Sequence, residues 1–399
     1  MRSFQCIVAI VASLWISQAR AQISESDIAR KQLELGLFAL KNGMTEQSAN
    51  VTVSPYSIHS AMMLLRLGAR GAIAAQMDER LLAGSFSPQA QESYRKLNAQ
   101  ISRSEEGLIS TPANTVWLRS DLKFQKDYLG AAQRTFATEP SSVDFTVPEK
   151  ARAIINEWVS ARTGALISQL LPPRFITERT TCVLVNALYF KSAWLHPFSK
   201  TDTRERDFWT SSSSSVKVSM MSHSRSMEYF EADGWQGVQL PYHSADFAFV
   251  VLVPTEKRAV REVARTLSHD LIIRSLQESA STRVNLLLPR FKVRFSTDLV
   301  GQLSAFGLTN LRDGDYSGLS TEGVGGISIN GVIHEAVVSV DEVGTEAAAA
   351  TAVGMAASGM PRIDPVKPKE VYVDRPFAFA LVHRTSSAPL FVGVVGDPR

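Results

Sequence analysis

The residue types that could do chemistry are present in this chain, but their spacing matches no catalytic motif. His334-Glu335 begins like a zinc-protease motif but lacks the second histidine, and the seven histidines are otherwise scattered. There is no G-x-S-x-G nucleophile turn, no P-loop, and no G-x-G-x-x-G following a predicted strand. RDGDYSG near Asp315 resembles half of a calcium loop without its remaining ligands. The sequence therefore predicts no enzyme, no metal site and no cofactor.

The most unusual stretch is the ribbon VDEVGTEAAAATAVGMAASGMPR, which spans residues 340–362. After one acidic cluster it is an almost charge-free run of Ala, Thr, Val, Gly and Met. Alanine and threonine lose little side-chain entropy when they become ordered, and small side chains can slide beneath a covering layer without collision. Such a segment can be exposed at first and later enter a β-sheet.

The first 21 residues have the parts of a secretory signal peptide. Arg2 gives the basic start, an apolar stretch runs from Cys6 to Ile16, and Ala19-Arg20-Ala21 is a small-x-small cleavage site. The alternative is an apolar first helix of the domain, since the stretch is too short to span a bilayer. We therefore expect residues 1–21 to be removed and residues 22–399 to be secreted and extracellular.

The mature chain would carry almost no net charge. Of the 42 basic residues, Arg2 and Arg20 lie in the signal peptide, which leaves 40 against 39 acidic residues. This balance gives no reason to expect nucleic-acid binding, and no later run resembles a membrane helix. Cys182 remains alone, which excludes a disulfide scaffold and favours a buried, inert thiol over a reactive thiol or an intermolecular bridge. Asn50-Val51-Thr52 is a glycosylation sequon whose occupancy stays open.

The elements that must position the ribbon are segregated along the chain. Residues 24–43 predict a helix with cap candidates at Ser24, Ser26 and Asp27, and Ser54-Pro55 predicts the start of a second helix. A third helical pattern ends near Gly164. The second half contains β-branched and aromatic runs bounded by Pro, Gly or Ser: TCVLVNALYF, FAFVVLVP, RVNLLLPRFKVRF, FAFALVH and LFVGVV. This segregation predicts an α+β fold.

The ribbon and its surroundings resemble the serpin family of serine protease inhibitors. The matches to the hinge of inhibitory serpins are Glu342, Gly344, Thr345, Glu346, Ala347, Ala348, Ala349, Ala350 and Thr351. Further family motifs follow in the same order from residue 50 to the C-terminus: VTVSPYSI, INEWVSARTGALISQLL, LVNALYFKSAW, VQLPYHSADFAFVVLVP, LPRFKV, VIHEAVVSVDE and DRPFAFALVHRTSSAPLFVGVVGDP. The resemblance implies one serpin domain over residues 22–399, with three β-sheets, about nine helices and an exposed reactive-centre loop at about 343–368.

The activity implied by this resemblance is suicide inhibition of a serine protease. The loop is bait: the protease attacks one of its peptide bonds and becomes acyl-linked to it. The hinge then enters sheet A as a new strand, drags the protease across the molecule and deforms its active site. The implied partner is a trypsin-like or elastase-like protease in a covalent complex with a monomeric inhibitor, which is consumed once.

The resemblance also implies roles for residues outside the loop. Four positions match the family's shutter, the hydrogen-bonded centre beneath sheet A that parts to admit the loop: Ser54, Ser57, Asn186 and His334. Trp194 matches the breach, where insertion starts, and Arg290 with Glu342 matches an ion pair at the base of the loop. Val343 and Glu335 depart from the family pattern. Neither departure obstructs insertion, because the small positions are intact.

The scissile bond has two candidates because the loop is longer than in typical members. The family spacing from Glu342 falls on Ser358-Gly359, whose small first residue suits an elastase-like protease. Pro361-Arg362 followed by Ile363 instead resembles a trypsin-like site. Met360-Pro361 is disfavoured, because the proline has no N–H and is conformationally restricted. Other bonds, such as Ala357-Ser358, stay open as a third alternative.

Three other functions are weighed against inhibition. A non-inhibitory serpin, acting as a carrier, storage protein or chaperone, tends to have bulky, charged or proline residues in the hinge, and this hinge has none from residue 347 to 353. A glycosaminoglycan-activated inhibitor is unsupported, because the basic residues of the region resembling helix D are scattered: Arg80, Arg95 and Lys96. A hydrolase with a triad hidden in the fold is the third alternative.

Overall fold

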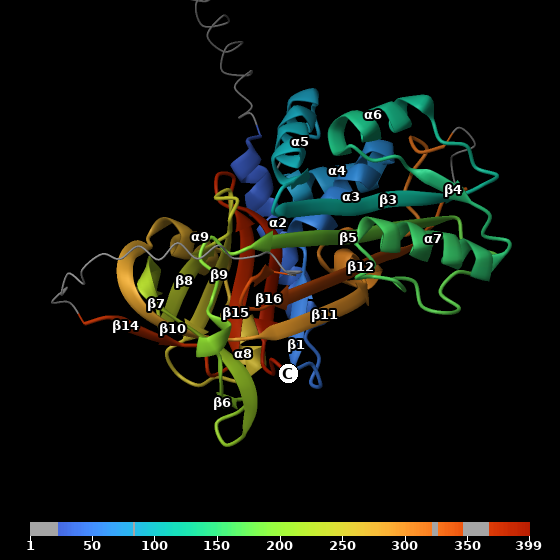
Figure 1. Cartoon of the computed structure of the whole chain (residues 1–399). Coiled ribbons are helices and arrows are strands. Elements are labelled where there is room, and N and C mark those ends of the chain that lie inside the picture. Colours follow the sequence, from blue (N-terminus) through green and yellow to red (C-terminus); the bar gives the residue numbers. More distant parts are fainter. Residues whose placement is uncertain (1–22, 83, 321–325, 346–366) are drawn as a thin grey trace, which may run out of the picture.

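Two β-sheets and nine α-helices make up the part of the chain that the structure describes (Figure 1). The structure is a computed structural model that describes residues 23–82, 84–320, 326–345 and 367–399. None of the helices in these ranges combines the length and the apolar character of a membrane span. Most helices precede most strands in the chain, and the predicted α+β class is confirmed.

The first helix shows why the sequence-based boundaries were accurate. Ser24 Oγ accepts a hydrogen bond from Asp27 N at 3.1 Å, and Asp27 Oδ2 accepts one from Ser24 N at 3.0 Å, which together form a capping box. Ser54 caps the next helix with one hydrogen bond, in which its Oγ accepts from Ser57 N at 3.2 Å. The nine helices are α2 Glu25–Gly43, α3 Pro55–Gly68, α4 Gly71–Met77, α5 Pro88–Ile101, α6 Lys126–Phe136, α7 Pro148–Arg162, α8 Val260–Thr266, α9 His269–Gln277 and α10 Val300–Ala305.

The seven-stranded sheet has the order β11-β12-β13-β5-β3-β2, with β4 paired to β3. Its strands are β2 Arg103–Glu105, β3 Leu108–Arg119, β4 Ser141–Val143, β5 Cys182–Ala193, β11 Phe291–Asp298, β12 Ile329–Val340 and β13 Gly344–Thr345. Its central strands β5 and β12 are parallel and pair directly over only part of their length. This incomplete pairing is the feature on which the candidate site depends.

The nine-stranded sheet joins what we expected to be two separate sheets. Its strands are β1 Asn50–Val53, β6 Arg204–Trp209, β7 Ser215–Ala232, β8 Trp235–Pro241, β9 Phe247–Pro254, β10 Ala280–Pro289, β14 Lys369–Tyr372, β15 Phe377–His383 and β16 Ala388–Val395. The 18-residue strand β7 pairs with β6 at its start, with β10 from Met220 to Tyr229, and with β8 at its end. Because β7 is continuous, the hydrogen-bonded ladder runs through both groups of strands, and the described residues form two sheets instead of three.

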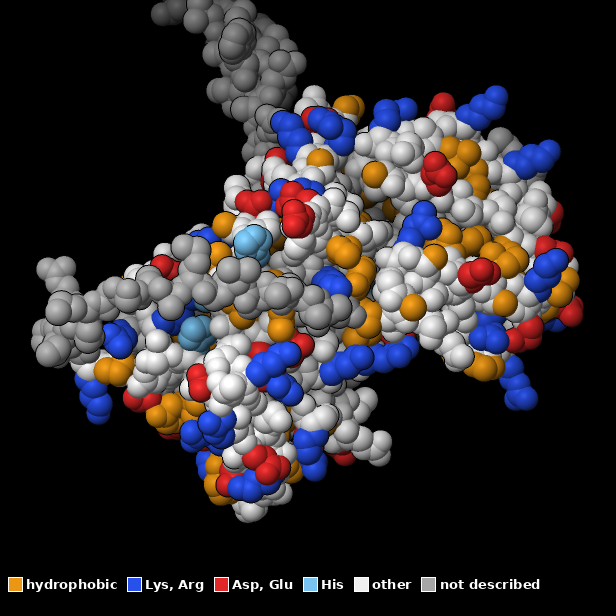
Figure 2. Space-filling view, in the orientation of Figure 1, with side chains coloured by type: hydrophobic (Ala, Val, Ile, Leu, Met, Phe, Trp, Pro, Cys, Tyr) orange, Lys and Arg blue, Asp and Glu red, His pale blue; other side chains and the backbone are white. Residues whose placement is uncertain are grey.

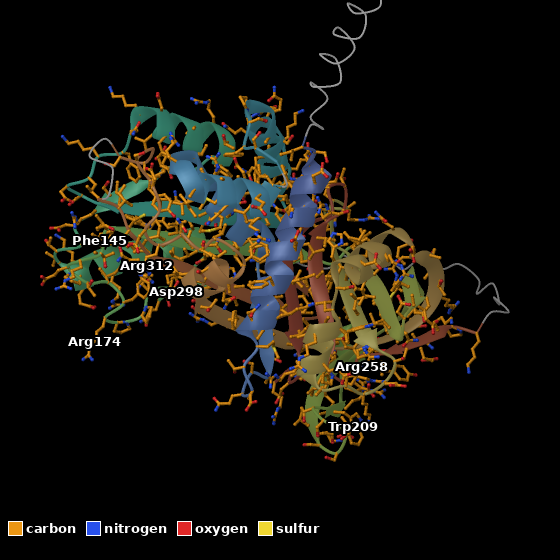
Figure 3. All side chains as sticks on the ribbon, turned by 180° about the vertical axis from the view of Figure 1, so that it is seen from behind. Phe145, Arg174, Trp209, Arg258, Asp298 and Arg312 are labelled. Atoms are coloured by element: carbon orange, nitrogen blue, oxygen red, sulfur yellow. The ribbon has the colours of Figure 1, made fainter. Side chains whose placement is uncertain are left out.

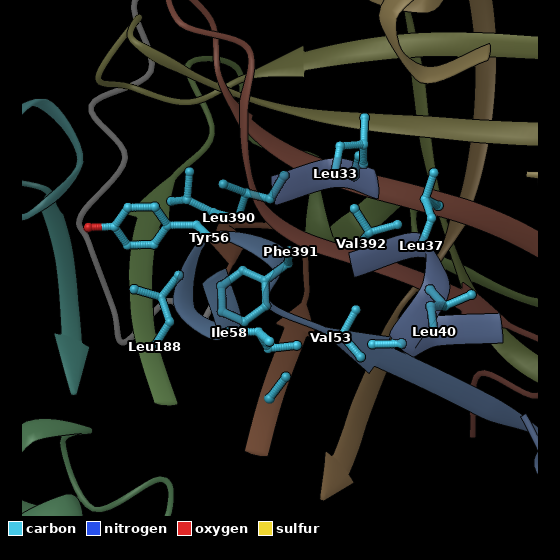
Figure 4. Packing of buried hydrophobic residues seen from close by; sticks show 14 of the residues in the cluster. Leu33, Leu37, Leu40, Val53, Tyr56, Ile58, Leu188, Leu390, Phe391 and Val392 are labelled. Atoms are coloured by element: carbon cyan, nitrogen blue, oxygen red, sulfur yellow. The ribbon is translucent and has the colours of Figure 1, made fainter. Parts of the chain in front are cut away.

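The core lies where α2 and α3 pack between the sheets. Seen from behind, α2 runs across the middle of the molecule, between Arg258 and Trp209 on one side and Asp298 and Arg312 on the other (Figure 3). The predicted apolar face of α2 is buried against β16, as the close-up shows (Figure 4). The residues of this contact include Leu33, Leu37, Leu40, Leu390 and Val392. A second apolar cluster lies between α7 and the opposite face of the seven-stranded sheet.

Asn50, the asparagine of the sequon, links β1 to the C-terminal segment. Its Nδ2 donates to Asp397 O at 2.6 Å, and its Oδ1 accepts from Gly396 N at 2.9 Å and Asp397 N at 3.0 Å. In the folded chain the nitrogen that a glycan would occupy is therefore engaged in a hydrogen bond. The side chain satisfies three backbone groups beyond the end of β16.

Replacing Asn50 with aspartate should destabilise the protein. Asn50→Asp keeps the shape of the side chain and the acceptor Oδ1 but replaces the Nδ2 donor with a second oxygen that faces Asp397 O. The free energy of unfolding should fall by about 1–3 kcal/mol. We expect a lower midpoint of thermal unfolding. The exposed Asn310→Asp is the control, because its Oδ1 only accepts from Thr309 Oγ1. Equal midpoints for both variants would contradict this assignment.

Candidate functional site

The candidate site is the place where β5 and β12 separate. The two strands pair in parallel from Cys182 and Ile329 up to Ala187 and Glu335. We call this level the fork. Beyond it, toward the C-terminal ends of both strands, which we call their upper ends, β5 and β12 no longer pair directly. The short strand β13 lies between these upper ends and is antiparallel to both strands.

A tight reversal brings β13 into this position. Asp341 Oδ1 accepts from Val343 N at 2.8 Å and from Gly344 N at 3.1 Å, while Asp341 N donates to Gly344 O at 3.1 Å. An aspartate that bonds the backbone two and three residues ahead stabilises such a turn. The chain therefore leaves β12 at Val340 and re-enters the same sheet in the opposite direction.

Gly344 and Thr345 fit closely between the two strands. A Cβ on Gly344 would lie 2.1 Å from Ser192 O, so only glycine permits this approach of the backbones. Gly344 is level with Ala193, while Thr345 is level with both Ser192 and Val340. The first two hinge residues after the turn are thus already strand residues of the sheet.

Trp194, the predicted breach residue, covers this region. Its Nε1 donates to Asp341 O at 2.9 Å and its backbone N donates to Val343 O at 2.8 Å. Its ring is 3% exposed and stacks on Tyr242, with the ring centroids 4.6 Å apart. Trp194 thereby holds both sides of the reversal against the end of β5.

Arg290 and Glu342 form the ion pair expected at the base of the loop. Arg290 Nε lies 2.7 Å from Glu342 Oε1, and Thr203 Oγ1 donates to the same oxygen. Burial alone would raise the pKa of Glu342, but the hydrogen bonds from Arg290 and Thr203 outweigh it and lower the pKa below its usual value. The carboxylate is thus ionised and keeps the turn next to β10.

The four predicted shutter residues come together beneath the sheet, and none is exposed. Ser54 N donates to His334 Nε2 at 3.1 Å, and His334 Nδ1 is 2.5 Å from Asn186 Oδ1. Ser57 N donates to Ser54 Oγ at 3.2 Å. The contact between Asn186 on β5 and His334 on β12 crosses the boundary that an entering strand would separate.

Asn114 belongs to this network and was missed in the sequence. It lies on β3 directly opposite Asn186, whose Nδ2 donates to Asn114 Oδ1 at 3.2 Å. Ser57 Oγ donates to the same oxygen at 2.6 Å. The available signal was weak, because Asn114 lies in a strand that mixes apolar residues with serine and threonine. Its importance becomes visible only when the register of β3 against β5 is known.

His334 is neutral in the folded protein. Burial lowers its pKa from 6.5 to about 3. Since Nε2 accepts from Ser54 N, the proton lies on Nδ1, which donates to Asn186 Oδ1. Protonation would place a second N–H opposite the Ser54 donor and would break the network.

Glu335 departs from the family pattern and is compensated locally. Its side chain is 2% exposed, and its Oε1 lies 2.7 Å from Arg294 Nε on the adjacent strand β11. Burial raises the pKa of Glu335, while Arg294 opposes that shift. Because β11 and β12 are paired over eight consecutive levels, from Phe291 to Asp298, this ion pair does not cross the fork.

The remaining predicted site residues lie outside the described ranges. These are the hinge residues Glu346, Ala347, Ala348, Ala349, Ala350 and Thr351, and the bond candidates Ser358, Gly359, Arg362 and Ile363. Across the described residues no group of three or more His, Cys, Asp or Glu side chains could hold a metal ion. Cys182 is buried, and burial raises the pKa of its thiol, as expected for an inert cysteine.

Comparison with known proteins identifies the family. The family model described as "Serpin (serine protease inhibitor)" matches residues 32–398. Human serpin B3 is 32% identical over 369 residues, covering 88% of this chain and 94% of that protein. The leukocyte elastase inhibitor of Sus scrofa is 32% identical over 382 residues, covering 93% and 98%. The chain therefore belongs to the serpin family, whose inhibitors are not enzymes.

A solved structure agrees with this assignment at the level of the fold. Serpin48 of the insect Tenebrio molitor superposes with a TM-score of 0.82 at 23% identity, covering 96% of this chain and all of that one. At this identity the likeness shows the fold alone. The serpin fold predicted from the sequence is thereby confirmed.

His334 should make stability depend on pH in a defined direction. Its pKa is about 3 when folded and about 6.5 when unfolded, so the folded state binds fewer protons between these values. The stabilisation is complete above pH 6.5 and declines as the pH falls toward 3, by at most about 1.4 kcal/mol per pH unit for this one proton.

The test compares the wild type with His334→Gln in urea at pH 6 and pH 4. The variant should lose less stability over this interval, because glutamine does not titrate. A residual decline is expected from His59, whose pKa burial lowers to about 4. Identical declines for the two proteins would contradict the role of His334.

Proposed function

We propose that this protein is a secreted inhibitor of serine proteases that acts as a suicide substrate through insertion of its loop. Loop insertion is the established mechanism of the family and is carried over to this chain. The observation that carries the proposal is the position of Gly344 and Thr345 between β5 and β12. Between the fork and β13, β5 and β12 do not pair with each other, so the residues that follow Thr345 could pair with both strands.

The register supports continuous insertion. If the antiparallel pairing of β13 continues, Ala350 comes level with Ala187 on β5 and with Glu335 on β12. Ala187 and Glu335 are themselves partners in the direct pairing below the fork. The entering strand therefore meets both neighbours in a common register, and Met355 would come level with Cys182, the first residue of β5.

The side chains that would point inward are small. Thr345 points toward Tyr242, on the face of the sheet that carries the shutter. Because side chains alternate along a strand, Ala347, Ala349 and Thr351 would point the same way. Thr351 would come level with Asn186 and His334, whose hydrogen bond must break when the strands separate by one strand spacing, roughly 4.8 Å.

Two ladders of hydrogen bonds make this insertion favourable. Each bond contributes about 0.5–1.5 kcal/mol net, so a strand of about ten residues paired on both sides gains on the order of 10 kcal/mol. This gain is similar to the whole stability of an ordinary domain. It suffices to deform the active site of an attached protease.

The length of the inserted segment bears on the scissile bond. Ser358 lies three residues beyond Met355 and Arg362 lies seven beyond it, which correspond to roughly 10 and 23 Å of extended chain. The shorter tether favours Ser358-Gly359 and an elastase-like target, while Pro361-Arg362 favours a trypsin-like target. The name of the related leukocyte elastase inhibitor supports the first class.

The charge distribution does not favour activation by a glycosaminoglycan. Arg95, one of the three basic candidates, is paired with Glu92 at 2.6 Å. On the face shown in Figure 2, Lys and Arg side chains are mostly mixed with Asp and Glu, apart from a few neighbouring basic side chains near the centre of the view. Activation by a polyanion is therefore not part of this proposal, in which the inhibitor is a monomer that meets its protease outside the cell.

Inhibition is tested by incubation with trypsin, chymotrypsin and elastase, followed by denaturing electrophoresis. We expect an SDS-resistant complex with at least one of these proteases. Ala347→Arg should convert the protein into a substrate, because the new side chain would point into the buried face beside the shutter. Glu346→Arg is the matched control, since residue 346 would point outward next to Ser339 and Lys191.

Two outcomes would reject the proposal. One is the absence of a stable complex with any of the proteases, as expected for a non-inhibitory serpin. The other is unchanged trapping by Ala347→Arg, which is incompatible with strand insertion. Hydrolysis of ester or peptide substrates by the protein alone would instead favour the hidden-triad alternative.

Mass spectrometry of the C-terminal fragment released on trapping identifies the scissile bond. We expect the fragment to begin at Gly359 or at Ile363. A fragment that begins before Met355 would contradict the proposed insertion, because too little chain would remain to fill the sheet. Sequencing the N-terminus of the native protein tests removal of residues 1–21 in the same sample.

A further inference from the structure

We propose that Tyr242 is a positioning residue that holds Thr345 in the sheet and so sets the fraction of attacking protease that is trapped. This inference rests on the proposed inhibitory function. It assigns a role to a residue that the motif comparison did not single out. Tyr242 does not touch the reacting bond and acts only through the hinge.

The contact is specific and fully buried. The Tyr242 hydroxyl lies 2.5 Å from Thr345 Oγ1, and the two residues are 0% and 2% exposed. The Tyr242 ring is fixed between Trp194, on which it stacks, and Phe190, whose ring centroid is 5.1 Å away. Because these two rings restrict rotation of the Tyr242 ring, the Tyr242 hydroxyl is held in place to bond Thr345 Oγ1.

The two partners belong to different sheets. Tyr242 follows β8 of the nine-stranded sheet, and its backbone N donates to Phe247 O at 3.1 Å on β9. Thr345 belongs to the seven-stranded sheet. The Tyr242 segment is also bound to the C-terminal end of β5: Tyr242 forms a β-bridge with Trp194, His243 N donates to Ala193 O at 2.8 Å, and Leu195 N donates to Pro241 O at 2.9 Å. When β12 separates from β5, Tyr242 therefore stays with β5 and can keep Thr345 paired to that strand.

The bond matters because the acyl-linked protease has two fates. Either the hinge continues into the sheet and the protease is trapped, or water attacks the ester. Hydrolysis restores the serine hydroxyl of the protease and leaves a carboxylate on the cleaved loop. An attached protease pulls on the loop. The fraction of molecules in which Thr345 stays paired between β5 and β12, which we call the seated fraction, therefore depends on the contacts of residues 341–345. Insertion starts from these seated molecules.

Tyr242→Phe removes only the hydroxyl and should raise the amount of inhibitor cleaved per protease trapped. Loss of one buried hydrogen bond should lower the seated fraction under load by roughly two- to tenfold. Thr345→Val removes the other partner and should have the same effect. The double variant should be no worse than either single variant, because both changes remove one shared interaction.

Tyr316→Phe is the matched control. Tyr316 is 2% exposed and its hydroxyl donates to Leu311 O at 2.5 Å, so this variant also loses one buried tyrosine hydrogen bond. It lies away from the hinge and should lower the thermal midpoint without changing the ratio of cleaved to trapped inhibitor. Hydrogen exchange of residues 340–345 should quicken in Tyr242→Phe and not in Tyr316→Phe.

Three outcomes would overturn the inference: an unchanged ratio in Tyr242→Phe, an equal rise in Tyr316→Phe, or additive effects in the double variant. These results are distinct from failure of the proposed function, in which the wild type itself would form no complex. Hydrogen exchange of residues 340–345 measures the pairing of Thr345 in the sheet even if the wild type traps no protease. Unchanged exchange at residues 340–345 would by itself reject the role of Tyr242.

Discussion

The structure depends on two parallel strands that share a register and are only half paired. Below the fork, β5 and β12 form a direct ladder, and above it their upper ends are separated by β13. Only an antiparallel strand can follow β13 into this place, and the reversal at Asp341 delivers the chain in that direction. An incomplete central ladder is an unusual arrangement, since paired backbone groups stabilise a sheet. Under the proposed function, insertion of the loop would complete this ladder and stabilise the protein further.

Two sets of interactions around the fork have opposite roles in the proposed insertion. Beneath the sheet, the bond between Asn186 and His334 holds β5 and β12 together. At the upper end, the contacts of Trp194 and Arg290 hold the reversal in place. The first set must open for a strand to enter, and the second must persist for it to enter from the correct end. A buried polar network suits the first role because its bonds can be exchanged for others, whereas an apolar contact would only be lost.

The parts of the fold that sequence reasoning predicted are those specified by local signals. The capping residues Ser24 and Asp27 fix the start of α2, and β-branched and aromatic runs mark strands such as β5, β9 and β16. The shutter and breach residues were found by resemblance to a family and not by any local pattern. Asn114 and Tyr242 were not identified, because their roles arise from register and from contact between sheets. The continuity of β7 was missed for a similar reason, since no turn residue marks where one predicted sheet ends and the next begins.

The central claim is that the chain becomes more stable when its loop is cut and enters the sheet. The most direct measurement is the midpoint of thermal unfolding before and after cleavage within residues 346–366 by a protease that is not trapped. For a domain of this length, a gain on the order of 10 kcal/mol predicts a midpoint higher by roughly 10–15 °C. A cleaved protein that unfolds at the same temperature as the intact one, or below it, would contradict the account.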